Sequence, residues 1–141
     1  MALDTHLLNL LSEAAAVAAL VGGPVTQTKN PCRIYMVELP QPVVYPCIGI
    51  QQVSGYESKT LDGTDGWENS RFQVDCWANN LADAWTLARA VHNAVKNYGG
   101  TRDGTKIKTI TRVLQQYFKE PAPNKMRIQM DFMIWHCETN L

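Results

Sequence analysis

Residues 70–78 alternate between apolar and polar positions. One parity is apolar throughout: Phe72, Val74, Cys76 and Ala78. The other parity is polar or charged until its last member: Arg71, Gln73, Asp75 and Trp77. Because successive side chains of a strand point to opposite faces, this pattern predicts a strand with one face on a core. A chain that contains it must build a sheet and cover one side of that sheet.

The rest of the chain supplies the cover and the neighbouring strands. Apolar residues recur at three- and four-residue spacing over 4–21 and over 81–98, which predicts two helices. Runs rich in branched and aromatic residues predict further strands at 32–39, 47–53, 107–118 and 126–137. Glycine and serine between 54 and 69 predict a long hairpin loop between the second and third strands. We therefore expect an α+β fold, an antiparallel sheet of four to five strands with two helices packed on one face.

Size and charge narrow the possible functions. The 141 residues suit a single domain, 1–141, and no boundary is visible inside it. The formal net charge is 0, whereas proteins that bind DNA by neutralising phosphates are usually basic. No run of 18 apolar residues is present, so no membrane span is expected. The first helix carries Asp4 and Glu13 but no basic residue, unlike the start of a signal peptide.

Motifs for catalysis and metal binding are missing from the sequence. There is no nucleophile elbow, zinc-protease helix motif, phosphate loop or dinucleotide fingerprint. The four cysteines, at 32, 47, 76 and 137, have no metal-ligand spacing and are expected to be reduced thiols. His6 and His92 are expected at the surface or boundary of their helices. His136 and Cys137 are neighbours in a strand, so they point apart and form no dyad. We expect no enzyme, no metal and no cofactor.

Charge is unevenly placed along the chain. Between 54 and 69 the acidic residues outnumber one lysine by three: Glu57, Asp62, Asp65 and Glu68. From 102 to 127 there are seven basic and two acidic residues, and the basic candidates for an interface are Lys106, Lys108, Arg112, Lys125 and Arg127. An acidic projection and a basic strand pair allow a head-to-tail contact between copies. Simple solvation of both regions is the alternative.

Two tryptophans lie on the polar parity of their strands. Trp77 and Trp135 would point away from the helices, and apolar groups there indicate that this face is covered. A partner subunit is one candidate for the cover. The long loop or the N-terminal segment folding over is the other.

A short internal similarity predicts a strand register. Residues 71–75 and 127–131 share one pattern of charged and apolar side chains. If Gln73 lies opposite Gln129, each arginine of one segment faces an aspartate of the other, and each such pair contributes about 0.2–1 kcal/mol. Coincidence between two amphipathic strands is the alternative.

Several segments, taken in order, resemble a known family. They are Arg33-Ile34-Tyr35, Leu39-Pro40-Gln41, Tyr45-Pro46-Cys47-Ile48, residues 71–78, the helical segment 83–88 and residues 127–132. Over residues 3–138 the chain resembles the tail completion, or tail terminator, proteins of long-tailed bacteriophages. Met36-Val37-Glu38 is a longer link than that family leads us to expect, and the strands are unusually rich in tryptophan.

The resemblance implies a structural protein of the virion, found in the tail or neck and assembled in the host cytoplasm. It implies a ring, usually of six copies, that caps the tail tube, ends its polymerisation and joins it to the head connector. DNA would pass through the lumen without specific binding, and the acidic loop is a candidate for the lumen or for a contact with a neighbouring copy. Two alternatives remain. One is a head-completion or connector adaptor ring of the neck. The other is a single-stranded nucleic-acid-binding module on a ferredoxin-like sheet, using Trp77, Trp135, Lys106, Lys108 and Arg112.

Overall fold

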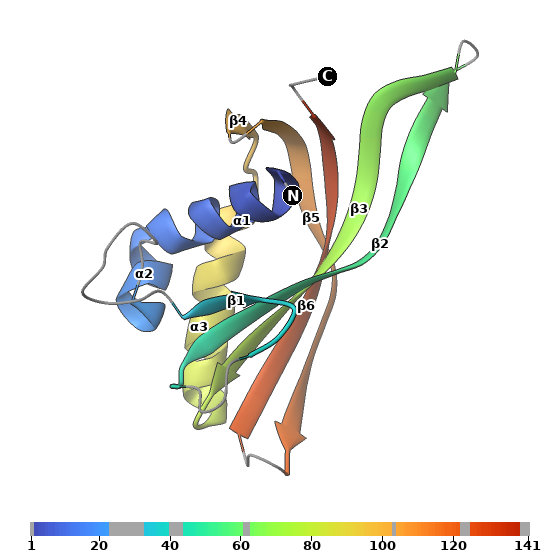
Figure 1. Ribbon diagram of the computed structural model, residues 1–141. Coiled ribbons are helices and arrows are strands. Elements are labelled where there is room, and N and C mark those ends of the chain that lie inside the picture. Colours follow the sequence, from blue (N-terminus) through green and yellow to red (C-terminus); the bar gives the residue numbers. More distant parts are fainter. Residues whose placement is uncertain are drawn as a thin grey trace.

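The computed structural model describes residues 2–22, 33–39, 44–60, 63–102, 104–121 and 125–138. These ranges contain three helices and six strands (Figure 1). The helices are α1 (Ala2–Glu13), α2 (Ala15–Val21) and α3 (Leu81–Val95). The strands are β1 (Ile34–Met36), β2 (Cys47–Thr60), β3 (Gly63–Ala78), β4 (Gly100–Arg102), β5 (Thr105–Glu120) and β6 (Lys125–Glu138).

The sheet is mixed and curls into a half-barrel (Figure 1). Its strand order is β1-β2-β3-β6-β5-β4, with β1 parallel to β2 and every other neighbour antiparallel. The expected antiparallel sheet of four to five strands with two helices is therefore wrong. Strand β4 spans three residues, which is too short for alternation to reveal it.

The expected first helix is two helices. Ala14 has φ −68° and ψ 122°, an extended conformation that separates α1 from α2. The apolar spacing continues across this residue, so periodicity gave no sign of the break. The second predicted helix is confirmed as α3, and its cap is Asn80, whose side-chain oxygen accepts a hydrogen bond from the Asp83 N–H at 2.9 Å.

The long hairpin loop expected over 54–69 is also wrong. Strands β2 and β3 continue through this stretch, pairing Tyr56 with Asn69 and Glu57 with Glu68. The two strands extend beyond the helices as an arm (Figure 1). We call residues 51–60 and 63–70 the hairpin arm. Few of its side chains are apolar, but antiparallel pairing uses the backbone, which every residue supplies.

All three helices pack on one face of the sheet and bury its apolar parity (Figure 1). Helix α1 contributes Leu3, Leu7 and Leu11, and α3 contributes Leu87, Val91 and Val95. The sheet contributes Ile48, Ile50, Phe72, Val74, Ile128, Met130, Phe132 and Ile134. Burying one such side chain stabilises a fold by about 1.5–3 kcal/mol. None of the three described helices covers the other face of the sheet or the hairpin arm, and these two regions hold the candidate site.

Candidate functional site

A buried serine–histidine contact lies between β3 and β6. Ser70 Oγ is 2.8 Å from His136 Nε2, and a Glu68 oxygen is 3.8 Å from the same nitrogen. In a catalytic triad the acid contacts the other ring nitrogen. Here His136 Nδ1 has no hydrogen-bond partner among the described residues, and Ser70 is only 1% exposed. Burial lowers the pKa of His136 despite the opposing effect of Glu68 and Glu138. The contact is closed to a substrate and belongs to the packing of the sheet.

His6 is fully buried, which corrects the expectation of a surface or boundary position. Its Nε2 is 2.6 Å from the Tyr98 hydroxyl, and its Nδ1 is 3.1 Å from the backbone oxygen of Thr105. The two rings also meet edge to face. His6 therefore connects α1 to Tyr98, which follows α3, and to the first residue of β5. His92 lies half-buried in the last turn of α3, and its ring stacks on Phe132 with centroids 6.4 Å apart. This is the boundary position that the sequence predicts.

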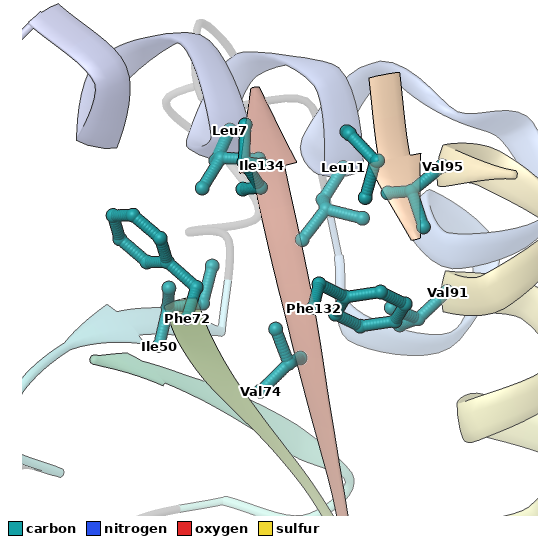
Figure 2. Close-up of a pocket in the computed structure, with 10 residues that line it drawn as sticks. Leu7, Leu11, Ile50, Phe72, Val74, Val91, Val95, Phe132 and Ile134 are labelled. Carbon is teal, nitrogen blue, oxygen red and sulfur yellow. The ribbon is translucent and has the colours of Figure 1, made fainter. Parts of the chain in front are cut away.

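The cavity between α1, α3 and the sheet carries no chemistry. Figure 2 shows side chains from both helices and from β2, β3 and β6 pointing toward one another. All ten residues that line it are apolar, including Phe72 and Phe132. The remaining space is about 10 Å³, at the lower limit for one water molecule. This is core packing with no group to bind or activate a substrate.

Cations and carboxylates pair on the outer face, by which we mean the face of the sheet turned away from the helices. Arg71 lies 2.8 Å from Asp131, and Arg127 lies 3.2 Å from Asp75. Burial raises the pKa of Asp75, although the Gln73 amide and the Arg127 guanidinium both act in the opposite direction. These pairs hold β3 to β6 and leave the centre of the outer face close to neutral.

The predicted strand register is wrong by two residues. Gln73 lies opposite Asp131 rather than opposite Gln129. A two-residue shift keeps every side chain on its face. The arginine–aspartate contacts therefore still form, because long side chains reach their partners diagonally.

Arg127 lies at the centre of a cluster around Trp77. Its guanidinium is 5.6 Å from the Trp77 ring centroid and 4.7 Å from that of Phe118. It also pairs with Glu120 at 2.8 Å. The Tyr45 ring also approaches Trp77, with ring centroids 6.4 Å apart. Trp77 is thus half-buried among residues of its own chain.

Trp135 lies in a second cluster, at the base of the hairpin arm. Its ring is 6.4 Å from that of Trp67. The ammonium groups of Lys106 and Lys108 lie 6.0 Å and 5.8 Å from the Trp67 centroid. Aromatic and cationic side chains therefore alternate over the outer face, and much of the tryptophan surface is covered from within the sheet.

The acidic candidates lie on the hairpin arm. Glu57 and Glu68 are directly opposite each other and both are exposed. Asp62 and the side chain of Asp65 lie outside the described residues. Like charges opposite each other destabilise a strand pair, so the arm carries this negative charge at a cost in stability.

The basic candidates divide into two groups. Three lie on β5 and are exposed: Lys106, Lys108 and Arg112. Lys125 and Arg127 lie on β6 and have partners within the chain. Lys125 donates a hydrogen bond to the Asn79 side chain at 2.7 Å, and Arg127 holds the pairs described above. Among these candidates, the exposed charge is therefore concentrated on β5.

Two open strand edges are the feature that sequence reasoning missed. Strand β1 pairs with β2 only at residues 48–50, and β4 pairs with β5 only at residues 105–107. Within the described chain, no strand pairs with the remaining outer edges. Large apolar side chains are exposed along both: Val53 42%, Tyr56 60%, Val113 46% and Tyr117 58%. The sequence carries one signal of this kind, because the apolar residues of 107–118 do not keep to one parity. Lys108 and Val113 are each the extra residue of a β-bulge, which changes the parity along β5.

Thiols and other metal ligands do not form a site in the structure as described. Cys47 and Cys76 are buried, Cys137 is half-buried, and Cys32 lies outside the described residues. Burial raises the pKa of Cys47 to about 12 despite the nearby Arg33, which makes it a poor nucleophile. Across the described ranges, no three His, Cys, Asp or Glu residues are grouped to hold a metal ion. No helix in those ranges combines the length and hydropathy that a membrane span requires.

Comparison with known proteins gives a family match and a structural match. The sequence model of the family described as tail completion protein gp17 matches residues 5–137. No curated protein matches the chain significantly. Among solved structures, one chain from the virion of a native gene transfer agent particle superimposes with a TM-score of 0.73 at 17% identity. The match covers 96% of this chain and 95% of that one, and at this identity it shows a shared fold.

Proposed function

Because this chain belongs to the family of tail completion protein gp17, it is a structural component of the phage tail, and we propose that its copies form a ring on the end of the tail tube. The observation that carries this proposal is the family match over residues 5–137, nearly the whole chain. The geometry supports it, because exposed charge and open strand edges suit assembly, and the polar groups of the described core are closed to substrate. We propose that the chain catalyses no reaction.

The ring would contain six copies joined by one repeated contact. A head-to-tail contact closes into a ring when two different surfaces of each copy are complementary. The chain offers such surfaces, an acidic hairpin arm and a basic β5. Side-chain contacts on the outer face would then stiffen the sheet that carries both surfaces. The residues that make these contacts are Trp77, Lys125, Arg127 and Trp135.

A ring on the tube end would stop tube growth by occlusion. Tube subunits add to the exposed end of the last ring of subunits, and a bound ring with a different upper surface offers no site for the next one. Its lower face would contact the tail tube protein and its upper face the head connector. The same protein would thus set the end of the tail and join the tail to the head.

DNA would pass through the lumen of this ring without being held. We propose that Glu57, Asp62, Asp65 and Glu68 line the lumen or contact the neighbouring copy. Carboxylates facing DNA repel phosphate and release no counterions, so they favour sliding over binding. The exposed positions of Glu57 and Glu68 agree with either placement.

Tube polymerisation provides the test. Purified tail tube protein is polymerised with and without this chain, and tube lengths are measured by electron microscopy. We expect shorter tubes with one ring at an end, and no binding of a single-stranded oligonucleotide at low salt. Unchanged tube lengths with tight binding to the head connector would assign the chain to a neck adaptor instead. Salt-sensitive oligonucleotide binding would favour a nucleic-acid-binding module.

A further inference from the structure

We propose that neighbouring copies associate through strand edges, with β2 residues 51–57 of one copy added to β5 residues 109–115 of the next. The inference rests on the proposed ring and specifies the surfaces that close it. Three independent features of the sheet lead to this pairing.

The first feature is that both edges are open over the same stretch of the sheet. We measure position along the strands by the β6 residue with which each position aligns, and call this position its height. Strand β1 covers β2 as far as Ile50, which aligns through Val74 with Met130 of β6. Strand β4 covers β5 as far as Ile107, which aligns with His136 of β6. Between Met130 and His136, residues 51–57 form one edge and residues 109–115 the other, and neither has a partner strand within the described chain. Copies placed side by side at equal height therefore bring open edge against open edge.

The second feature is strand direction. The neighbours β2, β3, β6 and β5 alternate in direction, so β5 runs antiparallel to β2 across the sheet. When copies repeat by rotation about an axis along the strands, β5 of one meets β2 of the next in antiparallel orientation. Backbone hydrogen bonds then continue from copy to copy in the pattern used inside each sheet.

The third feature is a pair of matching bulges. Val53 is the extra residue of a bulge in β2. It follows Gln52, which pairs with Phe72, and Phe72 in turn pairs with Phe132 of β6. Val113 is the extra residue of a bulge in β5, beside Arg112, which pairs with the same Phe132. The two valines are 42% and 46% exposed, so each edge presents an apolar side chain at one height. Natural sheets protect open edges with charge and with bulges, and the exposed valine at each of these two bulges supplies apolar surface that pairing with another strand would bury.

Charged residues flank both edge windows at the same end of the sheet. Glu57 is exposed at the upper end of the β2 window, at the height of His136. Lys108 is exposed on β5 between the positions that align with His136 and Trp135. Glu57 shares the helix side of the sheet with its cross-strand partner Glu68, whereas the Lys108 ammonium lies over Trp67 on the outer face. Strand direction, rather than an ion pair, therefore sets the orientation of the pairing.

The test uses lysine substitutions at the two bulges, each of which blocks one edge. The variants are Val53→Lys and Val113→Lys, and the matched control is Val44→Lys, an exposed valine outside both windows. Ser54→Lys and Thr111→Lys, at exposed positions beside the bulges, serve as a second pair in case a bulge substitution disturbs folding. Circular dichroism verifies the fold, and light scattering after gel filtration measures the mass, alone and with tail tubes.

We expect each edge variant to remain monomeric and to raise the apparent Kd of self-association by about tenfold or more, whereas the control assembles as the unmodified chain does. A mixture of the two variants has one intact edge on each partner, so it should form a dimer and stop there. Assembly of both variants into complete rings would overturn the edge pairing and leave the ring itself standing. Dimers of one variant alone would overturn it in favour of pairing between identical edges. An unmodified chain that stays monomeric even with tubes would overturn the proposed function, and the pairing with it.

Discussion

The centre of the sheet and the hairpin arm are built from the same two strands, yet different forces maintain them. At the centre, Ile50, Phe72 and Val74 are buried beneath the helices. In the outer part of the arm, Tyr56 and Glu57 are exposed, and a backbone ladder joins the two strands there. The centre therefore sets the stability of the chain, whereas the arm and the open edges present surface that assembly can use.

Core truncation should produce the largest effect and separate the two regions. Phe72→Ala removes a ring that is 1% exposed and enlarges the cavity of Figure 2, so it should lower the free energy of unfolding by about 3–5 kcal/mol. Tyr56→Ala removes a ring that is 60% exposed and should change it by less than about 0.5 kcal/mol. Urea denaturation measures both. Equal losses would show that the arm is as well packed as the centre.

Removing the half-buried Arg127 side chain should cause the next largest loss in the free energy of unfolding. Arg127→Ala leaves Asp75 without its ion pair in a site where burial already raises the pKa of that carboxyl. We expect a loss of about 1–3 kcal/mol, partly recovered by adding Asp75→Asn. Arg112→Ala is the matched control on the exposed edge, where the guanidinium contacts Gln115, and should cost about 0.5 kcal/mol or less. A double-mutant cycle with no coupling between Arg127 and Asp75 would refute the ion pair's contribution.

Acid should weaken the base of the arm through His136. Burial places its pKa below the ordinary value of 6.5, so below that pH the unfolded chain binds a proton that the folded chain does not. Stability from this residue is present above pH 6.5 and is lost as the pH falls through the lowered pKa. The free energy of unfolding should therefore decrease on acidification, and His136→Gln should flatten that slope. An identical slope in the variant would show that His136 does not contribute.

The sequence could predict the parts of the fold that repeat a local rule. Strict alternation identified the strand through Phe72 and Val74, and apolar spacing identified α3 from its first residue, Leu81. The break at Ala14 was not predictable, because it interrupts the backbone and leaves the apolar spacing intact. The arm was mistaken for a loop because its pairing depends on backbone groups that every residue carries. His6 was misplaced because its burial depends on Tyr98, which is distant in sequence.

For the site, residue types were visible but their surroundings were not. The sequence singled out Trp77, Trp135 and the basic strand residues. It could not show that Arg127 has four neighbours, since those contacts join β6 to β3 and β5. The open edges were also hidden, because they depend on how far β1 and β4 extend along their neighbours.

Imaging of assembled tails tests the proposed ring most directly. Tails are assembled from tube protein and this chain, with an added tag that electron microscopy can locate. We predict a closed ring of this chain at one end of each tube, the end that joins the head, with none along the tube wall. Tag density distributed along the tube, or single copies bound without a ring, would contradict the account.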